Sequence, residues 1–535
     1  MKNIIKTILL SVVVLGMSSC TEEKILDLKP INNILSPDAF KSPTLINTYM
    51  NGVYNAAAIG QYNAAPTSPN GGRGYVWGAA FVEQGETRGE DVVNMATFYE
   101  LTYKSTYDPT TANNVYYWVD GYRLINRCNI MIEGTKDAVA KGIITQAVGN
   151  DYIGQAKFLR AITHLELLTY FAKPYFYTPG ATHPGIPYRE VGVNTSEDIA
   201  SELGKPRNTV AEVYAKILID LNDAETLITT GSSTAFASRL VGRASKWAAI
   251  AFKTRLYLQK RDWANVILEG DKLKTAFALT ADPYTPFQNT ATPATSNSES
   301  IFSIQHSATA NPGVNGSLPS VLRNRALVCI SPILWRDTNS WLPDDKRRED
   351  GKFIFTASGI KYTNKYTDIT NQTDASPVIR YAEVVLNVAE AQARLGNTGP
   401  ALTLLNSVRN RSLANPVATS TNPIGQAYTA ASFATSDALV AGILKERRIE
   451  FVQEGRRWTD IHRLQGDPIA SVAIDGIPAK YASGAPAAAA FVLNNGFVVT
   501  KAIVAIPGDD FRFLWPIPQL EINTNPGLGQ NPGWN

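Results

Sequence analysis

The chain has 535 residues, of which 44% are hydrophobic and 18% are charged, and its formal net charge is +3. These proportions are typical of a folded globular protein, and the length suits one large domain or two to four smaller ones. A nearly neutral chain lacks the basic surface that a nucleic-acid partner requires, so we expect no such partner.

The first twenty residues have the order of a secretory signal. A positive leader precedes an apolar run over residues 8–15, which is too short to span a bilayer. The segment Met17-Ser18-Ser19-Cys20 is typical of a lipoprotein signal, which is cut just before the cysteine. We therefore expect Cys20 to carry fatty acids such as palmitate and to anchor the mature chain in a membrane. An ordinary signal peptide that contains a cysteine is the alternative.

The other cysteines and the histidines do not form an evident site. Cys128 and Cys329 can pair in an oxidising compartment or remain as two buried free thiols, and we favour the free thiols. The four histidines lie singly, without zinc-ligand spacing. We therefore expect neither a metal nor a cofactor.

Four pairs of helices are predicted from apolar residues at three- and four-residue spacing. In chain order they are Trp118–Ile132 with Tyr152–Phe171, Val210–Ile228 with the late helix Asp437–Glu454, the hairpin Arg243–Phe277, and the hairpin Ser376–Arg411. In the last hairpin Ser376 is expected to cap the first helix, Pro377 to open it and Gly396 to end it. The two hairpins have about the length of a tetratricopeptide repeat.

The segments between these helices differ from them in amino-acid composition. Residues 60–115 and 280–370 are rich in Gly, Pro, Ser, Thr and Asn, with short strand-like runs at Ile301–Gln305 and Phe353–Phe355. Residues 414–436 and 475–500 are loops of small residues. We therefore predict a mostly α fold, in which tetratricopeptide-like helical hairpins form a scaffold and an irregular, loop-rich face contains short strands.

Three acidic residues lie on one face of the late helix. Glu446, Glu450 and Glu454 are spaced four residues apart. One interpretation makes two of them a glycosidase pair, but arginine-paired acids make poor general acids. We favour a structural charge network in which the nearby Arg447, Arg448, Arg456 and Arg457 pair with the acids.

Five motifs, taken in order, resemble the SusD/RagB family over nearly the whole mature chain. They are Tyr122-Arg123-Leu124-Ile125-Asn126-Arg127-Cys128-Asn129; Gly154-Gln155-Ala156-Lys157-Phe158-Leu159-Arg160-Ala161; Tyr381-Ala382-Glu383 with Ala389-Glu390-Ala391; Glu446-Arg447-Arg448-Ile449-Glu450-Phe451 with Glu454-Gly455-Arg456-Arg457 and Asp460; and Trp515-Pro516-Ile517-Pro518 with Asn531-Pro532-Gly533-Trp534. The family usually has Glu where this chain has Gln155.

This resemblance implies an organisation and a function. A signal peptide at 1–19 is followed by an N-terminal SusD-like region at 20–240 and a C-terminal SusD/RagB-like region at 241–535, which we expect to form one compact unit. It implies a non-catalytic, surface-exposed lipoprotein of the outer membrane. Such a protein captures an oligosaccharide and delivers it to a SusC-like TonB-dependent transporter, which it covers like a lid.

Flat aromatic rings and planar polar groups suit the apolar faces and hydroxyl rim of a sugar. Family ligand sites draw on the N-terminal region and the middle loops. We therefore predict Trp77 as a stacking platform with Tyr75, Tyr99 and Trp335 as helpers, and Arg73 as a hydroxyl donor. Packing of each aromatic residue in the core is the alternative.

Three other functions remain open. A peptide-capturing relative would use the same scaffold, and a structural repeat adaptor would bind no soluble ligand. A secreted hydrolase is less favoured, because the sequence contains no Gly-x-Ser-x-Gly elbow, His-Glu-x-x-His helix or Walker loop.

Overall fold

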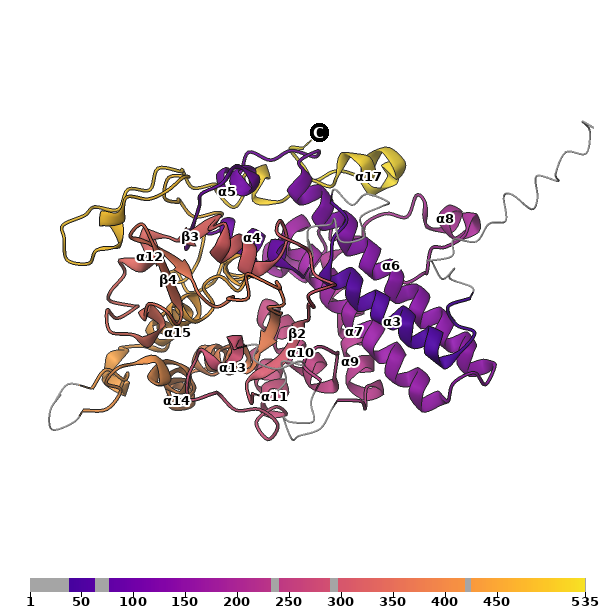
Figure 1. Ribbon diagram of the computed structural model, residues 1–535, viewed down its shortest axis with the longest axis horizontal. Coiled ribbons are helices and arrows are strands. Elements are labelled where there is room, and N and C mark those ends of the chain that lie inside the picture. The colour runs from indigo at the N-terminus through magenta and orange to yellow at the C-terminus, as the bar shows by residue number, and fades with distance from the viewer. Residues whose placement is uncertain (1–37, 63–76, 232–239, 289–296, 419–424, 535) are drawn as a thin grey trace, which may run out of the picture.

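The computed structural model describes residues 38–62, 77–231, 240–288, 297–418 and 425–534, and these are built mainly of α-helices (Figure 1). The longer helices are α3 (Pro43–Ala58), α6 (Ala112–Ala140), α7 (Gln146–Phe171), α9 (Val210–Leu227), α10 (Lys246–Gln259), α13 (Tyr381–Arg394), α14 (Thr398–Arg409) and α15 (Ser436–Glu450). The shorter helices are α4 (Ala79–Thr87), α5 (Glu100–Lys104), α8 (Ser196–Glu202), α11 (Trp263–Asp271), α12 (Pro332–Trp335), α16 (Arg457–Arg463) and α17 (Gln519–Thr524).

The strands of the described residues form three two-stranded antiparallel sheets. They pair β1 (Val92–Asn94) with β3 (Val328–Ile330), β2 (Ser300–Ile304) with β6 (Ser376–Arg380), and β4 (Ile354–Ala357) with β5 (Ile360–Thr363). The mostly helical fold class with short strands is therefore confirmed.

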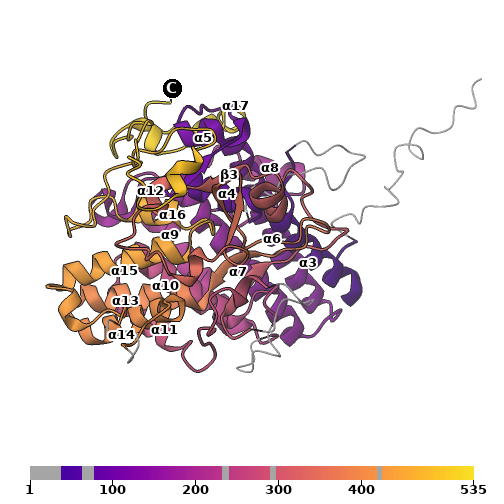
Figure 2. The same cartoon turned by 60° about the vertical axis from the view of Figure 1, so that its left-hand side comes forward.

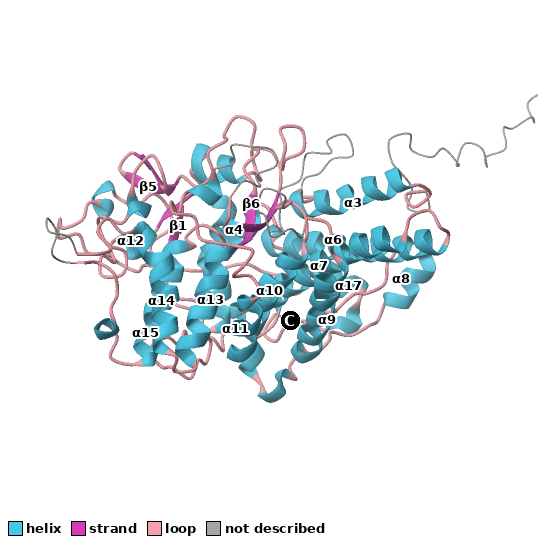
Figure 3. Ribbon diagram, turned by 90° about the horizontal axis from the view of Figure 1, so that it is seen from below, coloured by secondary structure: helices cyan, strands magenta, loops and turns pink. Residues whose placement is uncertain are grey.

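The helices form a continuous packed series. α6 packs against α3 and α7, α7 against α9, α9 against α10, and α10 against α11; α11 then contacts α13, which packs against α14 and α15. Figure 3 shows the strands gathered on one side of this series. The predicted pairing of the Trp118 and Tyr152 helices is the contact of α6 with α7.

Both predicted hairpins form, and local backbone geometry explains their turns. Ser245 caps α10 by accepting from the backbone N–H of Ala248, and the turn to α11 passes through Arg261 at φ +52°. In the other hairpin, Gly396 at φ +81° ends the helical path of α13, as glycine readily does.

The predicted start of the α13 hairpin is wrong. Residues Ser376–Arg380 form β6 rather than a helical turn, and the helix begins at Tyr381. Val378 and Ile379 are β-branched and buried, and Ile379 pairs with Phe302 of β2, so tertiary pairing overrides the Ser-Pro helix signal. Pro377 is tolerated because it lies beside a register shift of this small sheet.

Two predictions about the late helix are also wrong. α15 ends at Glu450 rather than Glu454, because the chain turns through Gln453 and Gly455, both with positive φ. α9 and α15 are not a helix pair, since α9 packs against α7 and α10, whereas α15 packs against α13 and α14. Apolar periodicity identifies a buried helix face but not the neighbour that buries it.

Segments that lie far apart in the sequence contact one another in the core. β1 pairs with β3 across more than two hundred residues, and the backbone N–H of Trp515 donates to the carbonyl of Tyr170 at 2.9 Å. Figure 2 shows α5 beside the C-terminal segment, where Lys480 Nζ donates to the carbonyl of Tyr103.

Cys128 and Cys329 are free and buried. Within the described ranges, each helix is too short or too polar to cross a bilayer.

Candidate ligand-binding groove and buried charge network

The structure places the predicted site residues in different environments. Cys20, Arg73 and Tyr75 lie outside the described residues. Trp77, Tyr99 and Trp335 are described, and their exposed fractions are 0%, 1% and 5%. None of these three rings presents a face to solvent.

Trp77 and Trp335 have packing partners in separate hydrophobic clusters. Trp77 contacts the Phe81 ring, and its indole N–H donates to Thr163 Oγ1 at 3.2 Å. Trp335 lies under the guanidinium of Arg348 and donates to the carbonyl of Phe491 at 2.9 Å. The structure does not bring these rings together, so their ligand-binding role stays a prediction.

A different part of the surface is hollowed. Two adjoining cavities of about 470 and 380 Å³ share Leu240 and Arg243. We call them together the Arg243 groove. Its walls come from α3, the start of α7, the residues just before α10 and the end of β2, and they include Asn47, Asn51, Tyr54, Asn55, Asp151, Tyr152, Gln155, Gln305, His306 and Ser307. This size lies within the range of small-ligand sites.

Arg243 lines both cavities of the groove, and Tyr54 lines the larger one. The Arg243 guanidinium lies over the Tyr54 ring at 4.4 Å, and it also donates to Asn51. The Tyr54 hydroxyl donates to Gln155 Oε1 at 2.8 Å and accepts from the backbone N–H of Ala244. Planar groups are therefore held in fixed orientations on a rigid helical wall.

Gln155, at the position where the resemblance implies Glu, makes two hydrogen bonds that together require an amide. Its Nε2 donates to Asp151 Oδ2 at 2.8 Å while its Oε1 accepts from Tyr54. An amide can do both, whereas a glutamate at this position would place a second carboxylate against Asp151. The groove therefore remains nearly neutral.

The β2 side of the groove adds further polar groups. Gln305 Nε2 is buried without an acceptor in the described part of the chain. His306 donates from Nδ1 to the carbonyl of Asp374, and burial lowers its pKa, so the ring is neutral. Exposed Asn55 faces the same cavity. Neutral amides and imidazole beside one arginine suit a ligand with many hydroxyls.

Sequence reasoning missed the groove because its members come from separate segments. Tyr54 and Gln155 lie 101 residues apart, and Gln305 is further along the chain. Arg243 stands at the start of a predicted hairpin, and nothing in its sequence neighbourhood indicates a binding role. Tryptophans were predicted to stack on the ligand, but the fold buries the predicted ones. No regular spacing in the sequence marks the amide residues of the groove.

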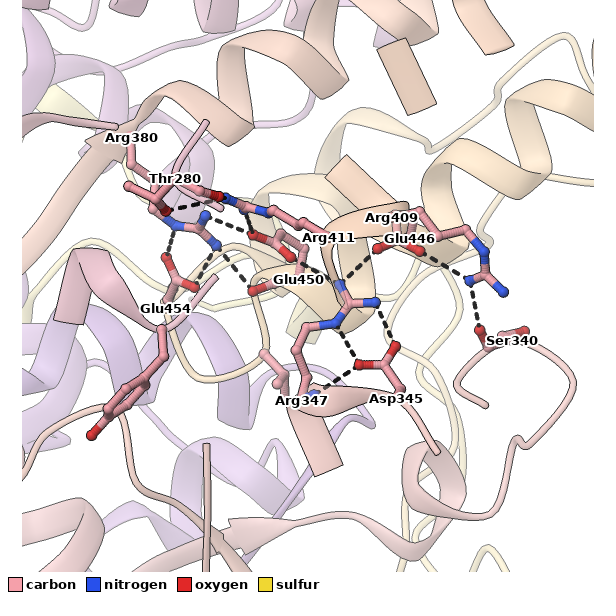
Figure 4. Close-up of polar contacts among 12 residues, drawn as sticks. Thr280, Ser340, Asp345, Arg347, Arg380, Arg409, Arg411, Glu446, Glu450 and Glu454 are labelled. Carbon is pink, nitrogen blue, oxygen red and sulfur yellow. Dashed lines mark hydrogen bonds and ion pairs between the residues drawn. The ribbon is translucent and has the colours of Figure 1, made fainter. Parts of the chain in front are cut away.

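The acidic face of α15 is the centre of a buried charge network (Figure 4). Glu450 forms ion pairs with Arg347, Arg380 and Arg411, with N–O distances of 2.8, 2.7 and 2.5 Å, respectively. The remaining pairs join Glu446 to Arg347 and Arg409, Glu454 to Lys365 and Arg380, Glu299 to Arg380 and Arg411, and Asp345 to Arg347. All of these side chains are buried, and the five acids balance the five cations.

The network keeps its acids ionised. Burial raises the pKa of Glu450, but Arg411, Arg380 and Arg347 outweigh burial and hold the pKa well below its usual range. The pKa of Glu299 is lowered in the same way, by Arg411 and Arg380 against its burial. An acid that stays ionised and enclosed cannot donate a proton to a leaving group, which agrees with a structural role.

The predicted partners of these acids are wrong, although the network exists. Arg447 pairs with Asp460, and Arg456 with Glu383. Arg448 and Arg457 pair instead with Glu90 and Asp91. Neighbours in sequence point away from the acidic face of α15, so its cations come from distant segments.

Two family models match the sequence. The model described as the SusD family matches residues 342–534, and the model described as starch-binding associating with outer membrane matches residues 24–258.

Curated and solved relatives agree with these models. SusD-like protein P38 of Formosa agariphila is 23% identical over 470 residues, covering 79% of this chain and 80% of the relative. A SusD superfamily structure from Bacteroides fragilis is 25% identical, with a TM-score of 0.70, covering 92% of this chain and all of that one. A SusD-like carbohydrate binding protein from Bacteroides vulgatus is 21% identical, with a TM-score of 0.68. The match covers 91% of this chain and 97% of that chain, and it shows a shared fold.

Proposed function

Because this chain belongs to the SusD/RagB family, we propose that it captures an oligosaccharide in the Arg243 groove and delivers it to a SusC-like TonB-dependent transporter of the outer membrane. The observation that carries this proposal is the neutral, polar lining around the Tyr54–Arg243 pair. Fixed amide and guanidinium groups match ligand hydroxyls without the cost of ordering them on binding.

The relatives support the same ligand class. One family model is described as starch-binding, and the solved structure from Bacteroides vulgatus is named a carbohydrate binding protein. The groove cavities of about 470 and 380 Å³ offer room for more than one sugar ring.

We infer that the protein is not a hydrolase. Asp151 is the one carboxylate among the described residues that line the groove, and glycoside hydrolysis ordinarily needs two flanking the bond. Asp151 already accepts from the backbone N–H groups of Thr229 and Thr230. Incubation of the protein with its oligosaccharide should yield no shorter products, and cleavage would contradict this inference.

A peptide ligand is the second candidate, because amides and one arginine also suit a peptide backbone. The exposed Asn55 on the cavity wall offers hydrogen bonds to either class. Side-by-side glycan and peptide arrays, probed with the mature chain, distinguish the two by which array retains the protein.

Replacing Arg243 should weaken binding of the array-selected oligosaccharide. We expect Arg243→Ala to lower affinity by about tenfold or more, since a hydrogen bond from a charged group contributes about 1.5–3 kcal/mol. Calorimetric titration measures the change. Arg512→Ala removes a partly exposed arginine that lines neither cavity, and it should bind like the wild type. Equal affinity for both variants would exclude the groove.

We further propose that the protein is held at the outer membrane, on the cell surface, by acyl chains on Cys20. The support is the sequence Met17-Ser18-Ser19-Cys20 behind an apolar run, followed by Glu22 and Glu23, as in surface-exported lipoproteins. Mass spectrometry of the native N-terminus should find fatty acids on Cys20, and Cys20→Ala should release the protein from the membrane fraction. Release of an unmodified wild-type chain would contradict the anchor.

A further inference from the structure

Several hydrogen-bond acceptors of the Arg243 groove are already used within its wall. Three amide oxygens accept from other lining residues: Asn47 Oδ1 from the Tyr152 hydroxyl, Asn51 Oδ1 from Arg243, and Gln155 Oε1 from the Tyr54 hydroxyl. The NH₂ groups of Asn47 and Asn51 donate to no other residue that the structure describes, and both residues are exposed. These two amides therefore offer a ligand donors rather than acceptors.

The negative charge of the groove is enclosed. Asp151 is 8% exposed. Its Oδ1 accepts from the backbone N–H groups of Thr229 and Thr230, at 3.0 and 2.9 Å, and its Oδ2 accepts from Gln155 Nε2 at 2.8 Å. Three donors of the wall therefore satisfy this carboxylate, which leaves little of it to bind a ligand.

The positive charge of the groove is accessible. Arg243 is partly exposed and lines both cavities, and it forms no ion pair within the described ranges. The Tyr54 ring below it and the Asn51 oxygen beside Nη2 fix the orientation of the guanidinium. Asn51 occupies one hydrogen of Nη2, so one edge of the guanidinium keeps two parallel N–H groups. Such an edge binds a carboxylate through two hydrogen bonds.

The available groups of the groove therefore suit a ligand that accepts hydrogen bonds and carries negative charge. A sugar hydroxyl donates as well as accepts, whereas a carboxylate only accepts. On the premise that the Arg243 groove is the oligosaccharide site, we propose that its ligand contains a uronic acid, a sugar with a carboxylate, and that this carboxylate pairs with Arg243. Asn47 and Asn55 lie one turn of α3 to either side of Asn51, where they can bind neighbouring sugar units.

Matched glycans test the ligand class on the full mature chain. An array would carry uronic acid oligosaccharides, each beside its carboxyl-reduced neutral counterpart, and sulfated oligosaccharides. We expect the protein to retain a uronic acid oligosaccharide, and carboxyl reduction to weaken its binding by about tenfold or more. Added salt should weaken the acidic ligand more than its neutral counterpart, because salt screens exposed charges.

The array separates failure of this ligand class from failure of the proposed function. A preferred ligand that is uncharged, or that is sulfated without a carboxylate, would overturn the uronic acid assignment and leave oligosaccharide capture intact. Retention of no glycan would contradict oligosaccharide capture and the uronic acid assignment together.

Two variants remove the accessible charge in different ways. Arg243→Gln deletes the guanidinium, and Asn51→Asp places a carboxylate of nearly the same shape against it. Each should weaken the acidic ligand by about tenfold or more and the carboxyl-reduced ligand by a smaller factor, as measured by calorimetric titration. Asn55→Ala is the control, since it removes an exposed amide of the groove without changing the charge. It should weaken both ligands by the same factor.

The comparison between the two ligands decides whether the carboxylate binds Arg243. If Arg243→Gln and Asn51→Asp weaken the acidic and the carboxyl-reduced ligand equally, as the Asn55→Ala control should, the carboxylate does not pair with Arg243.

Discussion

Replacing Glu450 by glutamine should lower the free energy of unfolding by about 3–5 kcal/mol. Glu450 is enclosed by Arg347, Arg380 and Arg411, and the substitution leaves these three buried guanidinium groups with less negative charge than they need. Buried cations that lack enough anionic partners destabilise the folded state. The expected loss is a large part of the free energy of unfolding of a typical domain. Urea unfolding followed by far-ultraviolet circular dichroism measures the change.

A matched control and the pH dependence separate this network from an ordinary surface ion pair. Glu349→Gln breaks an exposed pair with Lys352 and should cost less than about 1 kcal/mol. Because the folded-state pKa of Glu450 is lowered, its contribution is present above about pH 4 and is lost as the pH falls further. The difference between wild type and variant should therefore shrink in acid. A loss no larger than that of the control would contradict the network's structural role.

Trp77→Ala should also destabilise the protein by about 3–5 kcal/mol, because it leaves a cavity in the core. The ring is fully buried against Phe81 and hydrogen-bonded to Thr163. Tyr177→Ala removes a ring that is 56% exposed and should change stability by less than about 1 kcal/mol. Thermal unfolding of both variants gives the comparison.

The same variant decides between packing and ligand stacking for Trp77. If the ring only packs, the folded fraction of Trp77→Ala retains the wild-type affinity for oligosaccharide while its stability falls. If the variant is as stable as the wild type and loses binding, the stacking prediction holds and the core assignment is wrong. Trp77→Phe keeps most of the ring and should lose less stability than the alanine variant.

Local signals in the sequence predicted much of the scaffold. The hairpins around Lys260–Asp262 and Gly396 follow from apolar periodicity and turn residues that act within a few positions. The strand at Ser376–Arg380 was missed because its partner, β2, lies more than seventy residues earlier. A local helix signal there competes with a distant contact that the sequence alone does not reveal.

The candidate site was less predictable than the fold for the same reason. Tyr54, Arg243 and Gln305 become neighbours only when α3, the residues just before α10 and the end of β2 pack together. The charges of α15 are a partial case. The spacing predicted that the acids share one face and form a charge network, but it did not identify Arg347, Arg380 and Arg411 as their partners. Composition indicates the chemistry of a site, whereas topology decides which residues supply it.

The ion pairs of Glu90 and Asp91 have a consequence for how the protein is made. Their cations, Arg448 and Arg457, are synthesised more than 350 residues later. β1 likewise cannot pair until β3 has been synthesised. Early helices such as α6 and α7 can associate during synthesis, but their junction with the later half stays open until nearly the last residues emerge. Such long-range closure slows folding and prolongs the exposure of apolar surface to aggregation, so a holding chaperone would act on the N-terminal half.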